Sequence, residues 1–146
     1  MNNNDFIISF LEYLSKERNF SNHTIRNYKI DLIEFADYLN GIDSNLIITD
    51  IDRTFIQNFI KETSLSGKSD KTLQRKVASI KSLYKFLSLT NKVKSNISEL
   101  ISSPKVSKKL PHLLSLKEIE LLMKQPDLSS FKGIRDKSIL EIFYST

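Results

Sequence analysis

The amino-acid sequence predicts an all-α protein. Apolar residues recur at intervals of three and four along most of the 146 residues, which is the spacing of one helix face. The chain contains only three glycines and three prolines, fewer than a turn-rich β protein requires. We find no segment that alternates apolar and polar residues as a strand would, and no internal repeat.

The first two predicted helices lie in the amino-terminal part of the chain. An apolar stripe predicts a helix from about Asn3 to Arg18. Ser21 can cap a second helix, and Asn40 and Gly41 are expected to end it. The apolar stripe of the second helix consists of Ile25, Tyr28, Leu32, Phe35, Ala36 and Leu39. These positions cover roughly a third of the helix circumference, so one face is expected to pack on a core.

The next two predicted helices are separated by a polar loop at residues 64–69. Thr49 is expected to cap the third helix, with Asp52 three residues later in the place of a capping-box acid. Ser69 is expected to begin a long fourth helix that ends near Leu89. Apolar residues at helical spacing follow both caps.

The remainder of the chain is predicted to hold a linker and two shorter helices. A helical turn is expected over 97–101, and the proline-containing segment 102–114 is expected to be a linker. Ser115 and Glu118 form a capping box that opens a helix. The last helix is expected to run from about Lys132 to the end of the chain. Near its end it has almost no polar face, which suits a helix buried inside a larger domain. In this chain we expect it either to be poorly packed or to dock on the rest of the chain.

Positive charge is concentrated in the middle of the chain. The formal net charge is +5 overall. Counted from the sequence, residues 1–64 hold 6 Lys and Arg against 10 Asp and Glu, residues 65–111 hold 11 against 2, and residues 112–146 hold 5 against 5. The basic middle segment predicts a localised surface that binds a polyanion.

The predicted fourth helix has two different faces. At about 100° per residue, its cations fall within an arc of about 140°, and its apolar residues face the opposite side. The cationic arc contains Lys68, Lys71, Arg75, Lys81 and Lys85, with Ser82 among them. Lys76 lies off the arc, and Asp70 is the sole acidic residue between Leu65 and Lys94. A solvated surface helix is one interpretation, but such helices usually mix charges of both signs, so a surface for nucleic acid is favoured.

The sequence offers no catalytic or metal site. Cysteine is absent, which excludes disulfides and thiolate metal sites and is typical of a cytoplasmic protein. Neither His23 nor His112 has a second metal-binding side chain four residues away, so a metal pair on a helix is excluded. No glycine-rich phosphate loop occurs. No apolar run is long enough to cross a membrane. We therefore expect no catalytic residue, no metal and no cofactor in this chain.

Four short patterns follow one another along the chain. The first is Ser21, Thr24, Tyr28, Asp31, Leu32 and Phe35, and the second is Ser69, Thr72, Arg75, Leu83, Tyr84, Phe86 and Leu87. The third is Pro104, Lys105, Leu110, Pro111, Leu114, Ser115, Glu118 and Leu122, and the fourth is Arg135, Asp136, Leu140 and residues 143–146. Each pattern alone is weak. In this order and spacing, they resemble the amino-terminal part of a tyrosine recombinase of the phage integrase family, most like the Xer type.

The resemblance implies the DNA-binding portion of a site-specific recombinase, an enzyme of DNA strand exchange or integration such as one that resolves chromosome dimers. It implies a SAM-like core-binding bundle of four or five helices over residues 1–101, a linker over 102–114, and two helices of an incomplete catalytic domain over 115–146. In the family, the run that matches residues 143–146 is followed by Gly-x-Arg, whose arginine is the first active-site residue. This chain alone is therefore expected to bind DNA without cutting it.

The implied partners are double-stranded DNA and, in the full-length protein, other recombinase protomers in a tetramer. The family needs no cofactor, because a covalent tyrosine–phosphate bond conserves the energy of the broken DNA bond. The helices that begin at Ser21 and Ser69 are expected to lie at the major groove. The expected DNA contacts are His23, Thr24, Arg26 and Lys29 on the first helix, Lys68, Lys71, Thr72, Arg75, Lys81, Ser82 and Lys85 on the second, and Lys105, Lys108 and Lys109 in the linker.

Two other functions fit the same residues. A truncated regulator would occupy recombination half-sites without catalysis, and a helical protein-interaction module would use its cations to bind acidic partners. A steep fall in affinity for duplex DNA with rising salt distinguishes DNA binding from the protein module.

Overall fold

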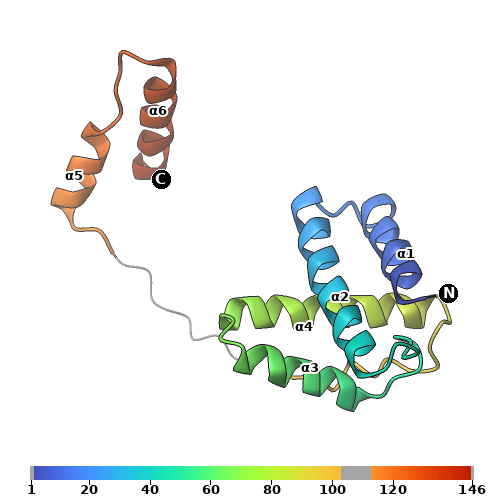
Figure 1. Ribbon diagram of the computed structural model, residues 1–146. Coiled ribbons are helices and arrows are strands. Elements are labelled where there is room, and N and C mark those ends of the chain that lie inside the picture. Colours follow the sequence, from blue (N-terminus) through green and yellow to red (C-terminus); the bar gives the residue numbers. More distant parts are fainter. Residues whose placement is uncertain (1, 103–112, 146) are drawn as a thin grey trace. The chain divides into compact units, whose positions relative to one another are not determined.

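Residues 2–102 and 113–145 are described by a computed structural model of the chain (Figure 1). They hold six helices and no strand, which confirms the predicted all-α class. The chain divides into two compact units, residues 1–107 and 108–146. The first contains α1 (Asn3–Lys16), α2 (Asn22–Ile42), α3 (Arg53–Leu65) and α4 (Asp70–Leu89), and the second contains α5 (Leu116–Lys124) and α6 (Phe131–Ser145). The functional domain boundaries expected from the sequence stay predictions.

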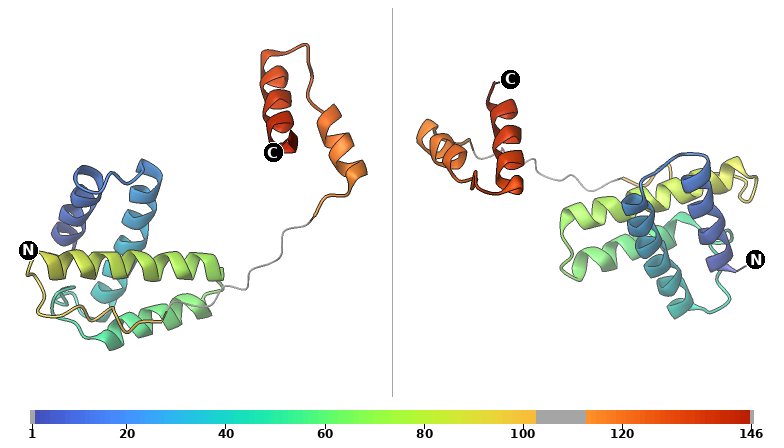
Figure 2. Two further views of the ribbon diagram at one scale, coloured as in Figure 1. Left: turned by 180° about the vertical axis from the view of Figure 1, so that it is seen from behind. Right: turned by 90° about the horizontal axis from the view of Figure 1, so that it is seen from above.

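The four helices of the first unit form two crossed pairs. α1 and α2 lie side by side, and α4 runs across both of them (Figures 1 and 2). α3 packs on α2 and on α4. This arrangement brings α2 and α4, the two helices expected to bind DNA, into direct contact.

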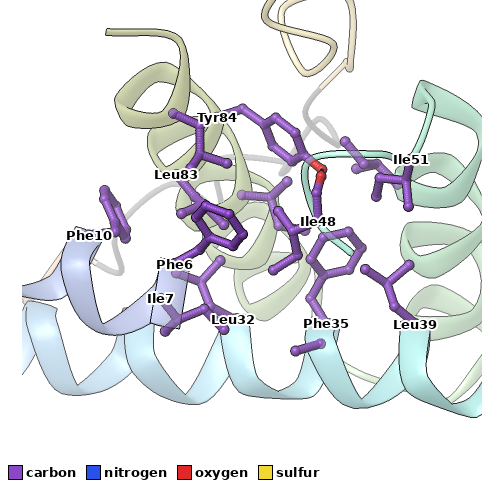
Figure 3. Close-up of a cluster of buried hydrophobic side chains, with 14 of the residues drawn as sticks. Phe6, Ile7, Phe10, Leu32, Phe35, Leu39, Ile48, Ile51, Leu83 and Tyr84 are labelled. Atoms are coloured by element: carbon purple, nitrogen blue, oxygen red, sulfur yellow. The ribbon is translucent and has the colours of Figure 1, made fainter. Parts of the chain in front are cut away.

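The core of the first unit is built from the predicted apolar stripes (Figure 3). From α2, Leu32, Phe35 and Leu39 are fully buried, whereas Ile25 and Tyr28 pack at the margin of the core. The other fully buried large side chains are Phe10 and Leu14 of α1, Ile48, Ile56 of α3, and Val77, Ile80, Leu83, Tyr84 and Leu87 of α4. Each fully buried aliphatic or aromatic side chain contributes about 1.5–3 kcal/mol through the hydrophobic effect.

The connection between α2 and α3 is held by side chains from other helices. The amide of Ile48 donates to Oδ1 of Asn3 at 2.8 Å. The hydroxyl of Tyr84, which points toward Ile48 in Figure 3, donates to the carbonyl oxygen of Ile48 at 2.7 Å. These bonds hold Ile48 in the connection. Thr49 lies in a turn, where its hydroxyl donates to Oδ1 of Asp50 and the amide of Asp50 donates to the carbonyl oxygen of Ile47. The predicted cap at Thr49 is therefore wrong. Asp52 caps α3 instead, with its carboxylate accepting from the amide of Thr54.

Three other predicted boundaries shift, while the caps at Ser21, Ser69 and Ser115 are confirmed. α1 ends at Lys16 rather than near Arg18. α2 continues through Gly41 to Ile42, because a glycine inside a helix costs only about 1 kcal/mol and nothing at this position forces a turn. The segment expected to be helical over 97–101 forms turns at 97–100, with Ile101 buried in the core.

The second unit is a helical hairpin with little core. Ser115 and Glu118 form the predicted capping box at the start of α5. At Gly133, an added Cβ would lie 1.9 Å from the carbonyl oxygen of Asp127, so only glycine permits this close approach of α6 to the preceding turn. Gly133 is the sole buried residue of α6, and Ile142 and Phe143 are exposed, as expected for a poorly packed last helix.

No helix within the described segments combines the length and the apolar character that a membrane crossing requires.

Candidate nucleic-acid interface

α2 and α4 begin with the same local structure. Ser21 caps α2 by accepting from the amide of Thr24, and Ser69 caps α4 by accepting from the amide of Thr72. In each cap the serine and threonine hydroxyls also lie about 3 Å apart. The positive end of each helix dipole is thus exposed at a polar, capped terminus, which is an arrangement that favours anions.

The outermost stripe of α4 carries lysines at its two ends and small or amide side chains between them. Lys71, Gln74, Ala78 and Lys85 are exposed, and Ser82 is half-buried on the same side. Lys71 and Lys85 are 14 residues apart, which corresponds to about 21 Å along the helix axis. We call this set, Lys71, Gln74, Ala78, Ser82 and Lys85, the α4 stripe.

Four lysines of the cationic face, one just before α4 and three within it, have no counter-ion in the described part of the chain. Lys68, Lys71, Lys81 and Lys85 make no ion pair with any described residue. Lys68, Lys71 and Lys85 are exposed, and Lys81 is half-buried. Their mutual repulsion is therefore unrelieved inside the protein, and a polyanion would relieve it.

Arg75 has a different environment from these lysines. Its Nη1 lies 2.5 Å from Oδ2 of Asp31 and donates to the backbone carbonyl oxygen of Asn27 at 3.2 Å. Both partners belong to α2, and the Arg75 side chain keeps 35% exposure. Arg75 thus joins the two helices while part of its guanidinium still reaches solvent.

Lys76 lies off the cationic face, as the sequence predicts, and the structure gives it a structural role. Its side chain is 3% exposed, and its Nζ bonds to Glu34 at 2.6 Å and lies 3.4 Å from Oδ1 of Asp31. Burial raises the pKa of Asp31 above its ordinary value, although the cations of Arg75 and Lys76 act in the opposite direction. The four charged groups form one network between α2 and α4.

The contacts predicted on α2 divide into two groups. His23 is exposed, and its Nδ1 lies 3.0 Å from Nδ2 of Asn27, which is the residue that Arg75 contacts. Thr24 is half-buried in the cap, and Arg26 and Lys29 are exposed. At about 100° per residue, Lys29 lies about 160° around α2 from Asn27. The structure therefore brings His23 to the Arg75 side of α2 and leaves Lys29 facing elsewhere.

Two residues at this surface, Gln74 and Asn27, and the buried Asp31 beneath it are absent from the predicted contacts. Gln74 lies inside the cationic arc of α4 by its angle, so its position in the sequence was a sufficient signal. Asn27 lies one turn after His23, but its proximity to Arg75 follows only from the packing of two helices. Asp31 belongs to the first of the four recombinase-like patterns. Nothing in the sequence of either helix alone predicts its ion pair with Arg75.

The predicted linker contacts Lys105, Lys108 and Lys109 lie outside the described residues. The described residues contain no group of acidic or histidine side chains that could hold a metal ion.

Comparison with known proteins places most of the first unit in one family. Residues 7–91 match the family described as the phage integrase, N-terminal SAM-like domain. The chain is similar to tyrosine recombinase XerC of Natranaerobius thermophilus, with 36% identity over 94% of this chain and 46% of the relative. It is also similar to tyrosine recombinase XerD of Staphylococcus epidermidis, with 35% identity over 98% of this chain and 48% of the relative. A third relative, tyrosine recombinase XerC of Bacillus subtilis, shares 33% identity over 97% of this chain and 46% of the relative.

The chain spans about half the length of the curated relatives it matches. No solved structure matches it.

Proposed function

The chain belongs to the tyrosine recombinase family, in its Xer-like branch, and we propose that it is the part of a site-specific recombinase that binds duplex DNA. The match to the phage integrase amino-terminal domain supports a role in DNA recombination and integration. The relatives named as tyrosine recombinases support the same role.

The single observation that carries the proposal is the α4 stripe with its uncompensated lysines. The major groove of DNA is about 12 Å wide and admits one α-helix. Lys71 and Lys85, about 21 Å apart along the axis, would reach phosphates on the two sides of such a groove. Gln74, Ala78 and Ser82 lie between them. The small side chains of Ala78 and Ser82 would let the helix approach the base edges, and the amide of Gln74 could hydrogen-bond to a base. Phosphate contacts then position the helix, and the central residues contact bases.

We propose duplex DNA and other recombinase protomers as the partners, with strand exchange as the reaction of the whole protein and chromosome dimer resolution as its setting. A tetramer on DNA and a location in the cytoplasm belong to the same proposal. The same proposal expects the 146 residues alone to bind DNA without cutting it. The proposal assigns no cofactor to these residues.

The test is a salt series with a fluorescently labelled DNA duplex and, separately, heparin as an unrelated polyanion. DNA binding through several phosphates predicts a steep linear fall of log affinity with log salt concentration. Affinity for the duplex should exceed affinity for heparin at the same ionic strength. Equal affinities would contradict the proposal and favour a helical module that binds acidic partners.

A further inference from the structure

We propose that Asp31 and the backbone carbonyl of Asn27 hold Arg75 so that its Nε and Nη2 present a fixed pair of donors to two acceptor atoms of DNA. This inference rests on the proposed function and deepens it. It makes Asp31 a positioning residue, namely an acidic side chain that strengthens the binding of an acidic ligand.

The geometry divides the donors of Arg75 into two sets. Nη1 makes both of the contacts to α2, to Oδ2 of Asp31 and to the carbonyl oxygen of Asn27. Nε and Nη2 make no hydrogen bond to the described residues. Among the described residues, Oδ1 of Asp31 is the single polar side-chain atom that is both buried and without a hydrogen bond. Nε and Nη2 of Arg75 also lack a hydrogen bond, so they are not buried and must reach solvent. Nε and Nη2 lie on one edge of the guanidinium, where their N–H groups are parallel. We call this pair of donors the fork.

The exposed fork suits acceptors that DNA provides. Two parallel N–H groups match two phosphate oxygens, or the O6 and N7 atoms of a guanine in the major groove. Arg75 lies one turn after Lys71 and about 40° from it around the helix, so its backbone position belongs to the same cationic face. The two acceptor sources share one chemistry, and the experiment below distinguishes them.

Asp31 is placed to act as a rigid support. It is fully buried, and its second oxygen faces Nζ of Lys76, which is itself bound to Glu34. An arginine held in this way loses less side-chain freedom when it binds a ligand than an unrestrained one would. The same ion pair therefore contributes to packing between helices and prepares a donor pair for DNA.

The decisive experiment exploits the sign of a charge change. Asp31→Asn and Asp37→Asn each remove one negative charge from α2, and Asp37 is exposed. Simple electrostatics predicts that both variants bind duplex DNA slightly more tightly than the parent chain. The positioning role predicts that Asp31→Asn binds about tenfold more weakly, the size of one bidentate arginine contact, while Asp37→Asn does not weaken. Binding is measured by fluorescence anisotropy with the full 146-residue chain, and folding is checked by circular dichroism.

Arg75→Lys provides the second variant, because it keeps the charge and loses the fork. It should also weaken binding about tenfold, and adding Asp31→Asn to it should cause little further loss, since the two residues act as one unit. If Asp31→Asn fails to fold, Arg75→Lys alone still tests the donor pair, because it leaves Asp31 in place. Binding by Arg75→Lys equal to that of the parent overturns the proposal, as does tighter binding by a folded Asp31→Asn.

Comparison of an A·T-only duplex with a guanine-containing duplex identifies the acceptor. An equal loss on both duplexes in Arg75→Lys supports phosphate, and a loss confined to the guanine-containing duplex supports guanine. Failure of the parent chain to bind either duplex would overturn the proposed function itself. A parent that binds, with an Asp31→Asn variant that behaves like Asp37→Asn, would overturn only the role of Asp31.

Discussion

Arg75 of α4 and Asp31 of α2 form an ion pair of 2.5 Å across the contact between the two helices that carry the recombinase patterns. The Asp31 side chain is fully buried, whereas Arg75 is partly exposed at the protein surface. The pair therefore connects the interior of the helical bundle with its cationic face. This connection means that the stability of the fold and the shape of the candidate DNA surface depend on the same residues.

The first prediction concerns the α4 stripe. Replacing both Lys71 and Lys85 with alanine should weaken duplex binding and reduce the slope of log affinity against log salt by about two, because each phosphate contact contributes about 0.9. The measurement is a salt titration by fluorescence anisotropy. Lys61→Ala, at an exposed position on α3, is the matched control and should change the slope less. An unchanged slope in the double variant would remove α4 from the interface.

The second prediction concerns the network around Asp31. Asp31→Ala should lower the free energy of unfolding by about 3 kcal/mol, because it leaves the buried Lys76 with one partner and Arg75 with no carboxylate. Urea denaturation followed by circular dichroism measures this change. Asp37→Ala, on the exposed side of α2, should change the free energy by less than about 0.5 kcal/mol. A similar small effect at Asp31 would show that the network adds little to stability.

The third prediction concerns the hydroxyl of Tyr84. Tyr84→Phe removes the donor to the Ile48 carbonyl and leaves that buried acceptor without its partner. The free energy of unfolding should fall by about 1–2 kcal/mol, as measured by urea denaturation. Tyr13→Phe is the control, since Tyr13 is half-buried and its hydroxyl makes no hydrogen bond to the described residues. Equal effects of the two substitutions would contradict a special role for this bond.

The fourth prediction contrasts two glycines. Gly133→Ala should destabilise the α5–α6 unit, because its Cβ would collide with the backbone of Asp127. Gly41→Ala should instead stabilise the first unit by up to about 0.5–1 kcal/mol, because Gly41 is helical in the last turn of α2 with nothing within 4 Å of the added carbon. Hydrogen exchange measured for each unit separately tests both. If the amides of the α5–α6 unit are as well protected from hydrogen exchange in Gly133→Ala as in the parent, the turn before α6 can move aside.

The fifth prediction concerns the capping box of α5. Hydrogen bonds from the backbone and side chain of Ser115 lower the pKa of Glu118 below its ordinary value. A carboxylate with a lowered pKa in the folded state stabilises the fold above its unfolded pKa, and this contribution is lost as the pH falls through the lowered value. Ser115→Ala should raise the pKa of Glu118 partway toward the ordinary value, as followed by carbon-13 NMR titration. The pKa of Asp127, which Ser129 lowers, should not move.

The sequence by itself determined the features that depend on a single helix. The apolar stripe of α2 and the caps at Ser21, Ser69 and Ser115 follow from local periodicity and local hydrogen bonding, so the structure confirms them. The separation of cations from apolar residues on α4 is also a property of one helix. The position of Gln74 within the cationic arc could have been read in the same way.

Only the tertiary structure decided the features that join two elements. Asp52 rather than Thr49 caps α3, and the connection before it is held by Asn3 and Tyr84, distant in sequence, which bind the backbone of Ile48. Likewise, no periodicity within α2 or α4 pairs Arg75 with Asp31, since that contact depends on how the two helices cross. Helical pattern depends on neighbours within four residues, whereas these hydrogen bonds and ion pairs join residues 36 to 45 positions apart.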